Sequence, residues 1–273
     1  APYPFPTDGL LVPTPSSFSP AQDPQLSVVI PCKNEAENLP ILIGEIAAAL
    51  AGRQLEILVI DDGSTDDTAA AAQRAGEVTG VAVRVLQHDR ASGQSAAVRT
   101  GVLHARGDII VCTDGDGQNN PAFMPALVDR LLELGPNFGM VGGQRIGRKD
   151  TAFKRFASRF ANTLRGAMLA DKTRDSGCGL KAVRADIFRR LPYFDGWHRF
   201  MAALVLREGY DVDFVDVIDR PRQFGVSKYG VFDRALIGSI DLFGVWWLKR
   251  RLKKRPVISE MTDLPNREGT ASS

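Results

Sequence analysis

Acidic residues follow three hydrophobic runs of this 273-residue chain. They occur in Pro31–Glu35, Asp61–Thr68 and Asp114–Gln118. In the third group, Asp114 and Asp116 flank one glycine, and side chains two positions apart on an extended backbone point to the same face. Carboxylates are hard oxygen ligands that suit Mg²⁺ or Mn²⁺ better than zinc, and substrate phosphates commonly complete such a shell. This spacing predicts a divalent-cation site.

Part of the second acidic group also has a structural interpretation. Ser64 with Asp67 three residues later matches the pattern of a capping box, and an acid such as Asp66 suits the first turn of a helix. A helix cap does not account for Asp61 and Asp62, which come before Ser64 at the end of a hydrophobic run. These two carboxylates are therefore candidates for a ligand site.

Hydrophobic patterning predicts the elements that position these groups. Strands are expected at residues 26–31, 55–60, 81–86 and 108–113, and helices at 36–51, 65–75, 94–105 and 121–134. The strands are hydrophobic runs without alternation, which indicates that both faces are covered and that the sheet is parallel. In such α/β sheets, ligands bind at the carboxyl ends of the strands, where the acidic groups lie.

The composition restricts the class of protein. With 44% hydrophobic residues the chain can bury a full core, and 34 basic against 32 acidic residues argue against general nucleic-acid binding. Three scattered cysteines are too few for a disulfide scaffold and favour a reducing compartment. No hydrophobic run reaches the length of a spanning helix, about 18 residues, and no signal peptide is visible.

The ends of the chain differ in composition from its centre. Seven of the sixteen prolines fall within the first 24 residues, which predicts a disordered, proline-rich tail over 1–24. The polar stretch 257–273 is predicted to be a flexible tail. One folded domain is then expected over residues 25–230, followed by an amphipathic and basic helix over 231–256.

The predicted C-terminal helix has two interpretations. From Ala235 onward, hydrophobic residues recur at helical spacing, and six cations follow within Lys249–Arg255. The paired residues Trp246 and Trp247 beside this basic cluster fit a helix on an anionic membrane surface. The same pattern also fits a helix docked on the folded domain with a solvated basic end.

The acidic groups belong to an ordered set of motifs. In chain order, the set comprises Val28–Glu35, Asp61–Asp66, Asp114–Gln118, Gly142–Arg145, Asp175–Gly179 and Arg222–Lys228. The first three resemble the family 2 glycosyltransferases, which have the GT-A nucleotide-diphospho-sugar transferase fold. The last three resemble the dolichyl-phosphate mannose synthase-like branch, whose members put a sugar onto a polyprenyl phosphate. The resemblance implies a mostly parallel sheet with helices on both faces, a catalytic domain over 25–230 and a C-terminal amphipathic helix.

The resemblance also implies roles for particular residues. The nucleoside pocket would be lined by Pro31, Lys33, Glu35, Ile60 and Asp62. The diphosphate would meet Asp114, Gly115 and Asp116, and the ligands of Mg²⁺ or Mn²⁺ would be Asp114, Asp116 and Gln118. Phosphates would be held by Arg145, Arg222 and Lys228, and the acceptor phosphate by Arg155, in a helix predicted over 149–169. The catalytic set would be Asp116, Gln118, Arg145 and Arg155.

Two positions depart from the family pattern. Lys33 stands where relatives usually have an aromatic residue, which favours a uridine over a guanosine nucleotide. The metal motif has glycines where relatives often have alanine and leucine, which predicts a more mobile turn. The expected partners are a UDP- or GDP-linked sugar, a polyprenyl phosphate and the membrane surface. The protein is expected to be peripheral, on the cytoplasmic face of the membrane, and a possible homo-oligomer.

The acceptor decides which chemistry is needed. A phosphate monoester has a second pKa of about 6, so it needs no base near neutral pH, and an in-line attack would invert the anomeric centre. A glycan or protein hydroxyl would need a general base, for which Asp175 and Asp195 are the candidates. A nucleotide-binding module without activity is a third alternative. His198 could lie near the acceptor, although a packing role accounts for it more simply.

Overall fold

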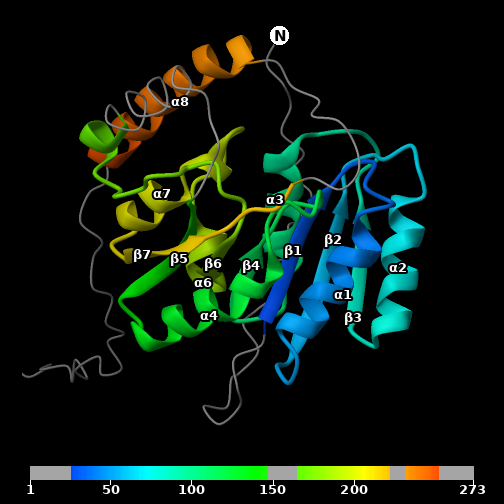
Figure 1. Cartoon of the computed structure of the whole chain (residues 1–273). Helices are drawn as coiled ribbons and strands as arrows, with labels where there is room; N and C mark the ends of the chain where they lie inside the picture. The colour runs from blue at the N-terminus through cyan, green and yellow to red at the C-terminus, as the bar shows by residue number, and fades with distance from the viewer. Residues whose placement is uncertain (1–25, 147–164, 222–230, 252–273) are drawn as a thin grey trace, which may run out of the picture.

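The computed structural model describes residues 26–146, 165–221 and 231–251 (Figure 1). Seven strands form one sheet in the order β3-β2-β1-β4-β6-β5-β7. The strands are β1 (Leu26–Cys32), β2 (Leu55–Asp61), β3 (Ala82–Gln87), β4 (Ile109–Cys112), β5 (Phe138–Arg145), β6 (Lys181–Arg184) and β7 (Asp211–Val217). β6 runs antiparallel to its neighbours β4 and β5, and the other neighbouring pairs are parallel. The predicted mostly parallel α/β sheet is confirmed.

Helices cover both faces of this sheet. One face carries α1 (Leu39–Ala49), α2 (Thr68–Thr79) and α4 (Met124–Glu133), and the other carries α3 (Gln94–His104), α6 (Ala185–Arg190), α7 (Met201–Arg207) and α8 (Val231–Arg250). In β1, Val28 and Ile30 belong to the hydrophobic cluster under α1, whereas Val29 belongs to the cluster under α3. Because the side chains on both faces of this strand are buried, its sequence shows no alternation of hydrophobic and exposed polar residues.

The loop between β2 and α2 differs from the predicted capping box. The helix begins at Thr68 rather than Thr65, and the carboxylate of Asp66 accepts the N–H of Thr68 at 3.1 Å. The hydroxyl of Ser64 instead accepts the N–H of Asn34, 2.9 Å away in the loop after β1. Ser64 therefore joins two loops at the edge of the sheet, and the prediction that it caps the helix is wrong.

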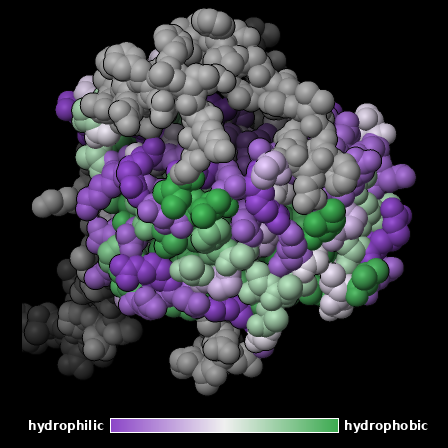
Figure 2. Space-filling model, viewed as in Figure 1, coloured by the Kyte–Doolittle hydropathy of each residue, from purple (hydrophilic) through white to green (hydrophobic). Residues whose placement is uncertain are grey.

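Other predicted elements are confirmed, with shifted ends. The helix predicted over 121–134 begins as the 3₁₀ turn η1 (Pro121–Phe123), and the C-terminal helix, predicted over 231–256, is described as α8 over Val231–Arg250. The predicted tails lie outside the described residues, as does the helix predicted over 149–169 except for its last turn. In the described part of the chain, no helix is both long and hydrophobic enough to cross a bilayer. On the face shown in Figure 2, hydrophilic residues surround several separate hydrophobic patches.

The topology gathers functional groups at one edge of the sheet. β2 and β4 lie on opposite sides of β1, and such a switch in strand order opens a crevice for ligands at the carboxyl ends of the strands. Because β6 is antiparallel, it begins where β4 ends, and Lys181 pairs with Cys112. The sheet thus brings a basic residue of β6 beside the acidic ends of β1, β2 and β4.

Candidate active site

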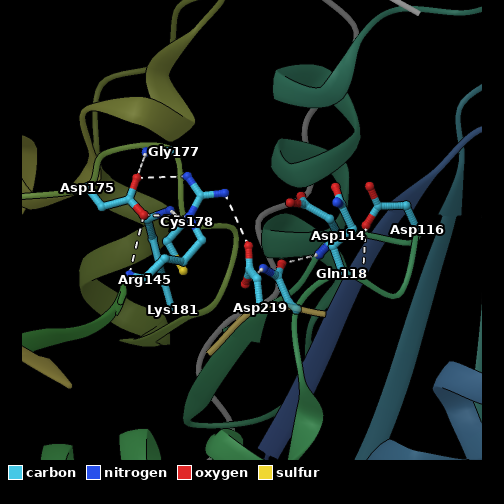
Figure 3. A network of polar contacts seen from close by, with 10 residues as sticks. Asp114, Asp116, Gln118, Arg145, Asp175, Gly177, Cys178, Lys181 and Asp219 are labelled. Atoms are coloured by element: carbon cyan, nitrogen blue, oxygen red, sulfur yellow. Dashed lines mark hydrogen bonds and ion pairs between the residues drawn. The ribbon is translucent and has the colours of Figure 1, made fainter. Parts of the chain in front are cut away.

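The turn after β4 holds two carboxylates side by side. One oxygen of Asp114 accepts a hydrogen bond from the side-chain amide of Gln94 at 2.7 Å, and Asp116 accepts the N–H of Gln118 at 3.1 Å. The N–H of Asp114 donates to the side chain of Asn119 at 3.2 Å. Figure 3 shows Asp114, Asp116 and Gln118 together on this turn. The structure therefore brings together the residues predicted to hold a divalent cation.

The electrostatics of this turn suit a cation. Burial, and next the neighbouring carboxylate of Asp116, raise the pKa of Asp114 to about 6, and the charges of Lys181 and Arg145 offset only part of this. Among the described residues, no three His, Cys, Asp or Glu side chains are placed to hold a metal by themselves. Mg²⁺ and Mn²⁺ accept one or two carboxylates with other oxygen ligands, so this donor set fits them.

Two glycines of the turn meet structural requirements. A Cβ at Gly115 would lie 2.9 Å from the Cβ of Cys32 and 3.2 Å from the carbonyl oxygen of Pro31, so the turn approaches the end of β1 more closely than any side chain permits. Gly117 has a φ of +70°, in the left-handed region. Packing and backbone conformation thus account for these glycines, and the greater mobility of the turn stays a prediction.

Asp62 anchors the segment before α3, at the part of the sheet edge where a nucleoside is predicted to bind. Its carboxylate accepts the N–H groups of Ser92 at 2.7 Å and Gly93 at 2.8 Å, and it lies 2.8 Å from Nδ1 of His88. Burial alone would raise the pKa of Asp62, but these hydrogen bonds outweigh it and the pKa lies below its ordinary value. Asp62 is therefore an ionised group that orders the segment before α3.

The other predicted nucleoside contacts differ in accessibility. Pro31 lines the main cavity, and Glu35 accepts a hydrogen bond from the side chain of Asn38 at 2.6 Å. Lys33 is half-buried at the end of β1. The side chain of Ile60 is fully buried in the cluster under α3, and Ile60 does not line this cavity, so the structure does not support a side-chain contact with the nucleoside.

Arg145 is held by two carboxylates at the end of β5. Its Nε and Nη2 donate to Asp175 at 2.5 and 2.8 Å, and its Nη1 donates to Asp219 at 3.3 Å. In Figure 3, Asp219 lies between this arginine and the turn that carries Asp114. Asp219 also accepts a hydrogen bond from Asn119, so the network connects the predicted phosphate-binding arginine to the carboxylate turn.

A cavity of about 440 Å³ opens beside Asp114. Its wall includes Gln94 of α3, Lys181 of β6, Arg145, and the residues His198 and Arg199. The last two belong to the 3₁₀ turn η2 (Trp197–Arg199). The cavity is therefore lined by one carboxylate, that of Asp114, and by several cations.

The structure leaves three predicted residues unplaced and adds others. Arg155, Arg222 and Lys228 lie outside the described residues. Gln94, Lys181 and Asp219 were not predicted. Gln94 could have been noticed as the first residue of a helix that follows a strand end, but no local pattern marks the other two, because their position depends on how β6 and β7 enter the sheet.

Gly179 allows the cavity wall to approach the carboxylates. A Cβ at this position would collide with the carboxylate of Asp114 and lie 2.6 Å from Oδ1 of Asn119. We expect Gly179→Ala to displace Asp114 and to lower kcat about 100-fold, because small displacements at a reacting site have effects of this size. Steady-state kinetics with circular dichroism would check it. Gly166→Ala, where a Cβ meets nothing within 4 Å, is the matched control and should keep its activity.

Comparison with known proteins identifies the family and the relatives that this chain resembles. The family model described as "Glycosyl transferase family 2" matches residues 27–191. The dodecaprenyl-phosphate galacturonate synthase of Rhizobium johnstonii is 35% identical over 87% of this chain and 70% of its own length. An undecaprenyl-phosphate 4-deoxy-4-formamido-L-arabinose transferase of Klebsiella pneumoniae is 36% identical over 75% of this chain. The chain spans only 62% of the length of that second relative.

Solved structures show the same fold. Glucosyl-3-phosphoglycerate synthase of Mycobacterium tuberculosis, in complex with Mn²⁺, UDP-glucose and glycerol 3-phosphate, has a TM-score of 0.62. Sequence identity is 21%, and the match covers 85% of this chain and 82% of that one. This similarity confirms the predicted GT-A fold. Because the family model matches from the first strand of the sheet to the residue after α6, the chain belongs to glycosyl transferase family 2.

Proposed function

We propose that this glycosyltransferase moves a sugar from a nucleotide-diphosphate sugar to a polyprenyl phosphate. The product would be a polyprenyl-phosphate-linked monosaccharide that serves as a donor for envelope glycan or lipid modification. The observation that carries the proposal is a single cavity lined by the carboxylate of Asp114, beside Asp116 on the same turn, and by the cations Arg145, Lys181 and Arg199. The names of the two relatives, both polyprenyl-phosphate sugar transferases, support this acceptor.

The state of the candidate bases favours a phosphate acceptor over a hydroxyl. Burial would raise the pKa of Asp175, but its hydrogen bonds from Arg145 outweigh this, and the pKa lies below its ordinary value. Such a carboxylate is a poor proton acceptor near neutral pH. Asp195 is exposed and does not line the cavity. A phosphate monoester needs neither residue, because it is largely a dianion at neutral pH.

The residues of the turn fit a divalent cation. Mg²⁺ or Mn²⁺ held by Asp114, Asp116 and Gln118 would neutralise charge on the leaving diphosphate. Gln94 orients Asp114 through its hydrogen bond, and Arg145 is held in place by Asp175 and Asp219. These contacts exist before substrate binds, so little of the site has to reorganise during the reaction.

We further propose that α8 brings the enzyme to the bilayer as a peripheral protein, on the cytoplasmic face. One side of the helix packs on the domain through Val245, which is buried, and through Leu242, Trp246 and Leu248. The other side exposes Ile240 (65%), Phe243 (60%) and Trp247 (51%). Arg250 and Arg251 stack 4.2 and 5.5 Å from the tryptophan rings at the C-terminal end of the helix. A hydrophobic side bordered by cations suits an anionic membrane surface.

This exposed side is open to a direct test. We expect the double variant Phe243→Ser, Trp247→Ser to bind anionic liposomes at least about tenfold more weakly, because each large side chain contributes 1.5–3 kcal/mol on burial, roughly. Liposome co-sedimentation would measure it. Val78→Ser removes an exposed valine (87%) of α2 and is the matched control. Equal binding of the double variant and wild type would contradict the membrane role of α8.

The acceptor is tested by product analysis. The protein would be incubated with Mn²⁺, radiolabelled UDP- and GDP-sugars and undecaprenyl phosphate in detergent, and then extracted with organic solvent. We expect label from one donor to enter the organic phase. Nucleotide binding without any labelled lipid would contradict the acceptor and would favour a hydroxyl acceptor, or a nucleotide-binding module if no sugar is transferred at all. The possible homo-oligomer stays a prediction.

A further inference from the structure

Lys181 places a buried positive charge in the cavity wall. Its side chain is only 8% exposed, although it lines the cavity beside Asp114. Among the described residues, its ammonium has a single hydrogen bond, to the carbonyl oxygen of Cys178, and no ion pair. Buried lysines are usually paired with a carboxylate, because an uncompensated charge is costly to remove from water. Lys181 therefore has donor capacity that the described protein does not satisfy.

The carboxylates near the cavity are not paired directly with Lys181 among the described residues. Arg145 is already neutralised by Asp175 and Asp219. The guanidinium of Arg199 acts on the carboxylate of Asp241 through its charge, but it forms no ion pair with any residue that the structure describes. Asp114 is close enough for Lys181 to lower its pKa, but it shares its environment with the carboxylate of Asp116. Lys181 and Arg199 thus present two cations to the cavity without a direct carboxylate partner among the described residues.

His198 adds a neutral hydrogen-bond donor to this wall. Its Nδ1 lies 2.8 Å from the hydroxyl of Ser95, and that hydroxyl also accepts the N–H of Gly196 at 2.8 Å. The hydroxyl proton has no other acceptor among the described residues, so it goes to Nδ1 and leaves the ring proton on Nε2. Burial, followed by the charges of Lys181 and Arg199, lowers the pKa of His198 to about 3. The ring is thus neutral at working pH, and its Nε2–H has no acceptor in the part of the chain that the structure describes.

We propose that Lys181, His198 and Arg199 form an oxyanion subsite in the cavity. The ligand is an oxyanion of a substrate: a carboxylate on the transferred sugar, as in a hexuronic acid, or the phosphate of the acceptor lipid. An oxyanion would compensate the buried ammonium through charge-assisted hydrogen bonds, whereas a neutral hydroxyl would leave it uncompensated. The identity of the substrate that supplies the oxyanion rests on the proposed function, but the subsite itself does not.

Binding alone tests the subsite. We expect inorganic phosphate and glucuronate to raise the Tm of the wild-type protein and to leave that of Lys181→Met unchanged. Lys181→Met without ligand should melt at the same or a higher temperature than wild type, because it removes a buried charge, so a folding defect is recognisable. Lys172→Met, which removes an exposed lysine outside the cavity, should respond to both anions as wild type does. Equal stabilisation of Lys181→Met and wild type would overturn the proposal.

Kinetics then distinguish the two sources of the oxyanion. UDP-glucuronate, UDP-galacturonate and UDP-glucose would be compared as donors, with undecaprenyl phosphate as acceptor. An increase in KM of about 10- to 100-fold in Lys181→Met for the uronate donors alone assigns the subsite to the sugar carboxylate. The same increase for the lipid alone assigns it to the acceptor phosphate. Unchanged KM values for all substrates would overturn the proposal. If no lipid is glycosylated at all, the proposed function fails, and the binding measurements still decide on the subsite.

A second pair of variants tests the donor role of His198. His198→Gln keeps an N–H near the position of Nε2, and His198→Phe keeps only the ring shape. We expect the glutamine variant to retain most of the anion-induced rise in Tm and the phenylalanine variant to lose most of it. Equal losses in both variants would show that His198 acts through packing and would remove it from the subsite.

Discussion

Asp116→Asn should lower turnover by about 1,000-fold while the fold is retained, because a carboxylate ligand of a catalytic cation stabilises the transition state by several kcal/mol, roughly. Transfer of labelled sugar to lipid would measure the loss, and isothermal titration with Mn²⁺ would show weaker binding. The carboxylate concerned lies on the turn after β4, next to Asp114. Asp129→Asn is the matched control, since Asp129 is a partly exposed residue of α4, remote from the turn, that pairs only with Arg53 among the described residues.

The stability of the Asp116→Asn variant distinguishes a metal ligand from a residue that the fold requires. The pKa of Asp114 is raised to about 6, so the folded protein binds more protons than the unfolded chain between about pH 4 and 6, and stability falls as pH rises through that interval. The charge of Asp116 is one cause of the raised pKa of Asp114, so removing it reduces this loss of stability. We therefore expect Asp116→Asn to be at least as stable as wild type at pH 7.5. Activity within tenfold of wild type, with normal Mn²⁺ binding, would contradict the metal assignment.

Arg145→Met should lose both activity and stability. The guanidinium stands at the end of β5 in the cavity wall, where it is predicted to hold phosphate, and removing one such electrostatic contact lowers kcat by about 100- to 1,000-fold. The substitution also leaves Asp175 and Asp219 without their cation. Breaking a largely buried ion pair from one side costs about 3 kcal/mol. Chemical denaturation and steady-state kinetics would measure the two effects separately.

A double variant separates these two consequences. In Arg145→Met, Asp175→Asn, one of the carboxylates left without a cation is also neutralised, so we expect part of the lost stability to return. Activity should stay low, because no cation is restored. Recovery of activity together with stability would mean that Arg145 acts only as a structural partner of Asp175. An acidic limb in the pH–rate profile of wild type that disappears in Asp175→Asn would instead favour a hydroxyl acceptor, because that limb reports the ionisation of a general base.

Local sequence patterns predicted the carboxylate turn well. The hydrophobic run that becomes β4 ends at Cys112, and a glycine between Asp114 and Asp116 marks a turn, so both the strand end and the pair of neighbouring carboxylates follow from residue types alone. The parallel sheet followed from hydrophobic runs without alternation, because side chains on both faces of strands such as β1 are buried.

The basic side of the cavity could not be predicted in the same way. Lys181 lies in a glycine-rich segment that resembles a loop, and it reaches the site only because β6 enters the sheet antiparallel and pairs with Cys112. No local pattern specifies such a pairing over a long sequence separation. The prediction that Ser64 caps α2 was wrong for a related reason. The N–H of Asn34, thirty residues away, donates to the hydroxyl that would otherwise cap the helix.

The first two residues of α3 have a consequence for redesign of the enzyme. Gln94 supports Asp114, and the adjacent Ser95 supports both His198 and the backbone of Gly196. Substitutions that reshape the cavity around His198 therefore risk disturbing the carboxylate turn through a single peptide unit. Met201, which also lines the cavity, has no part in this connection. A library intended to broaden the range of accepted sugars should begin at Met201 and leave the start of α3 intact.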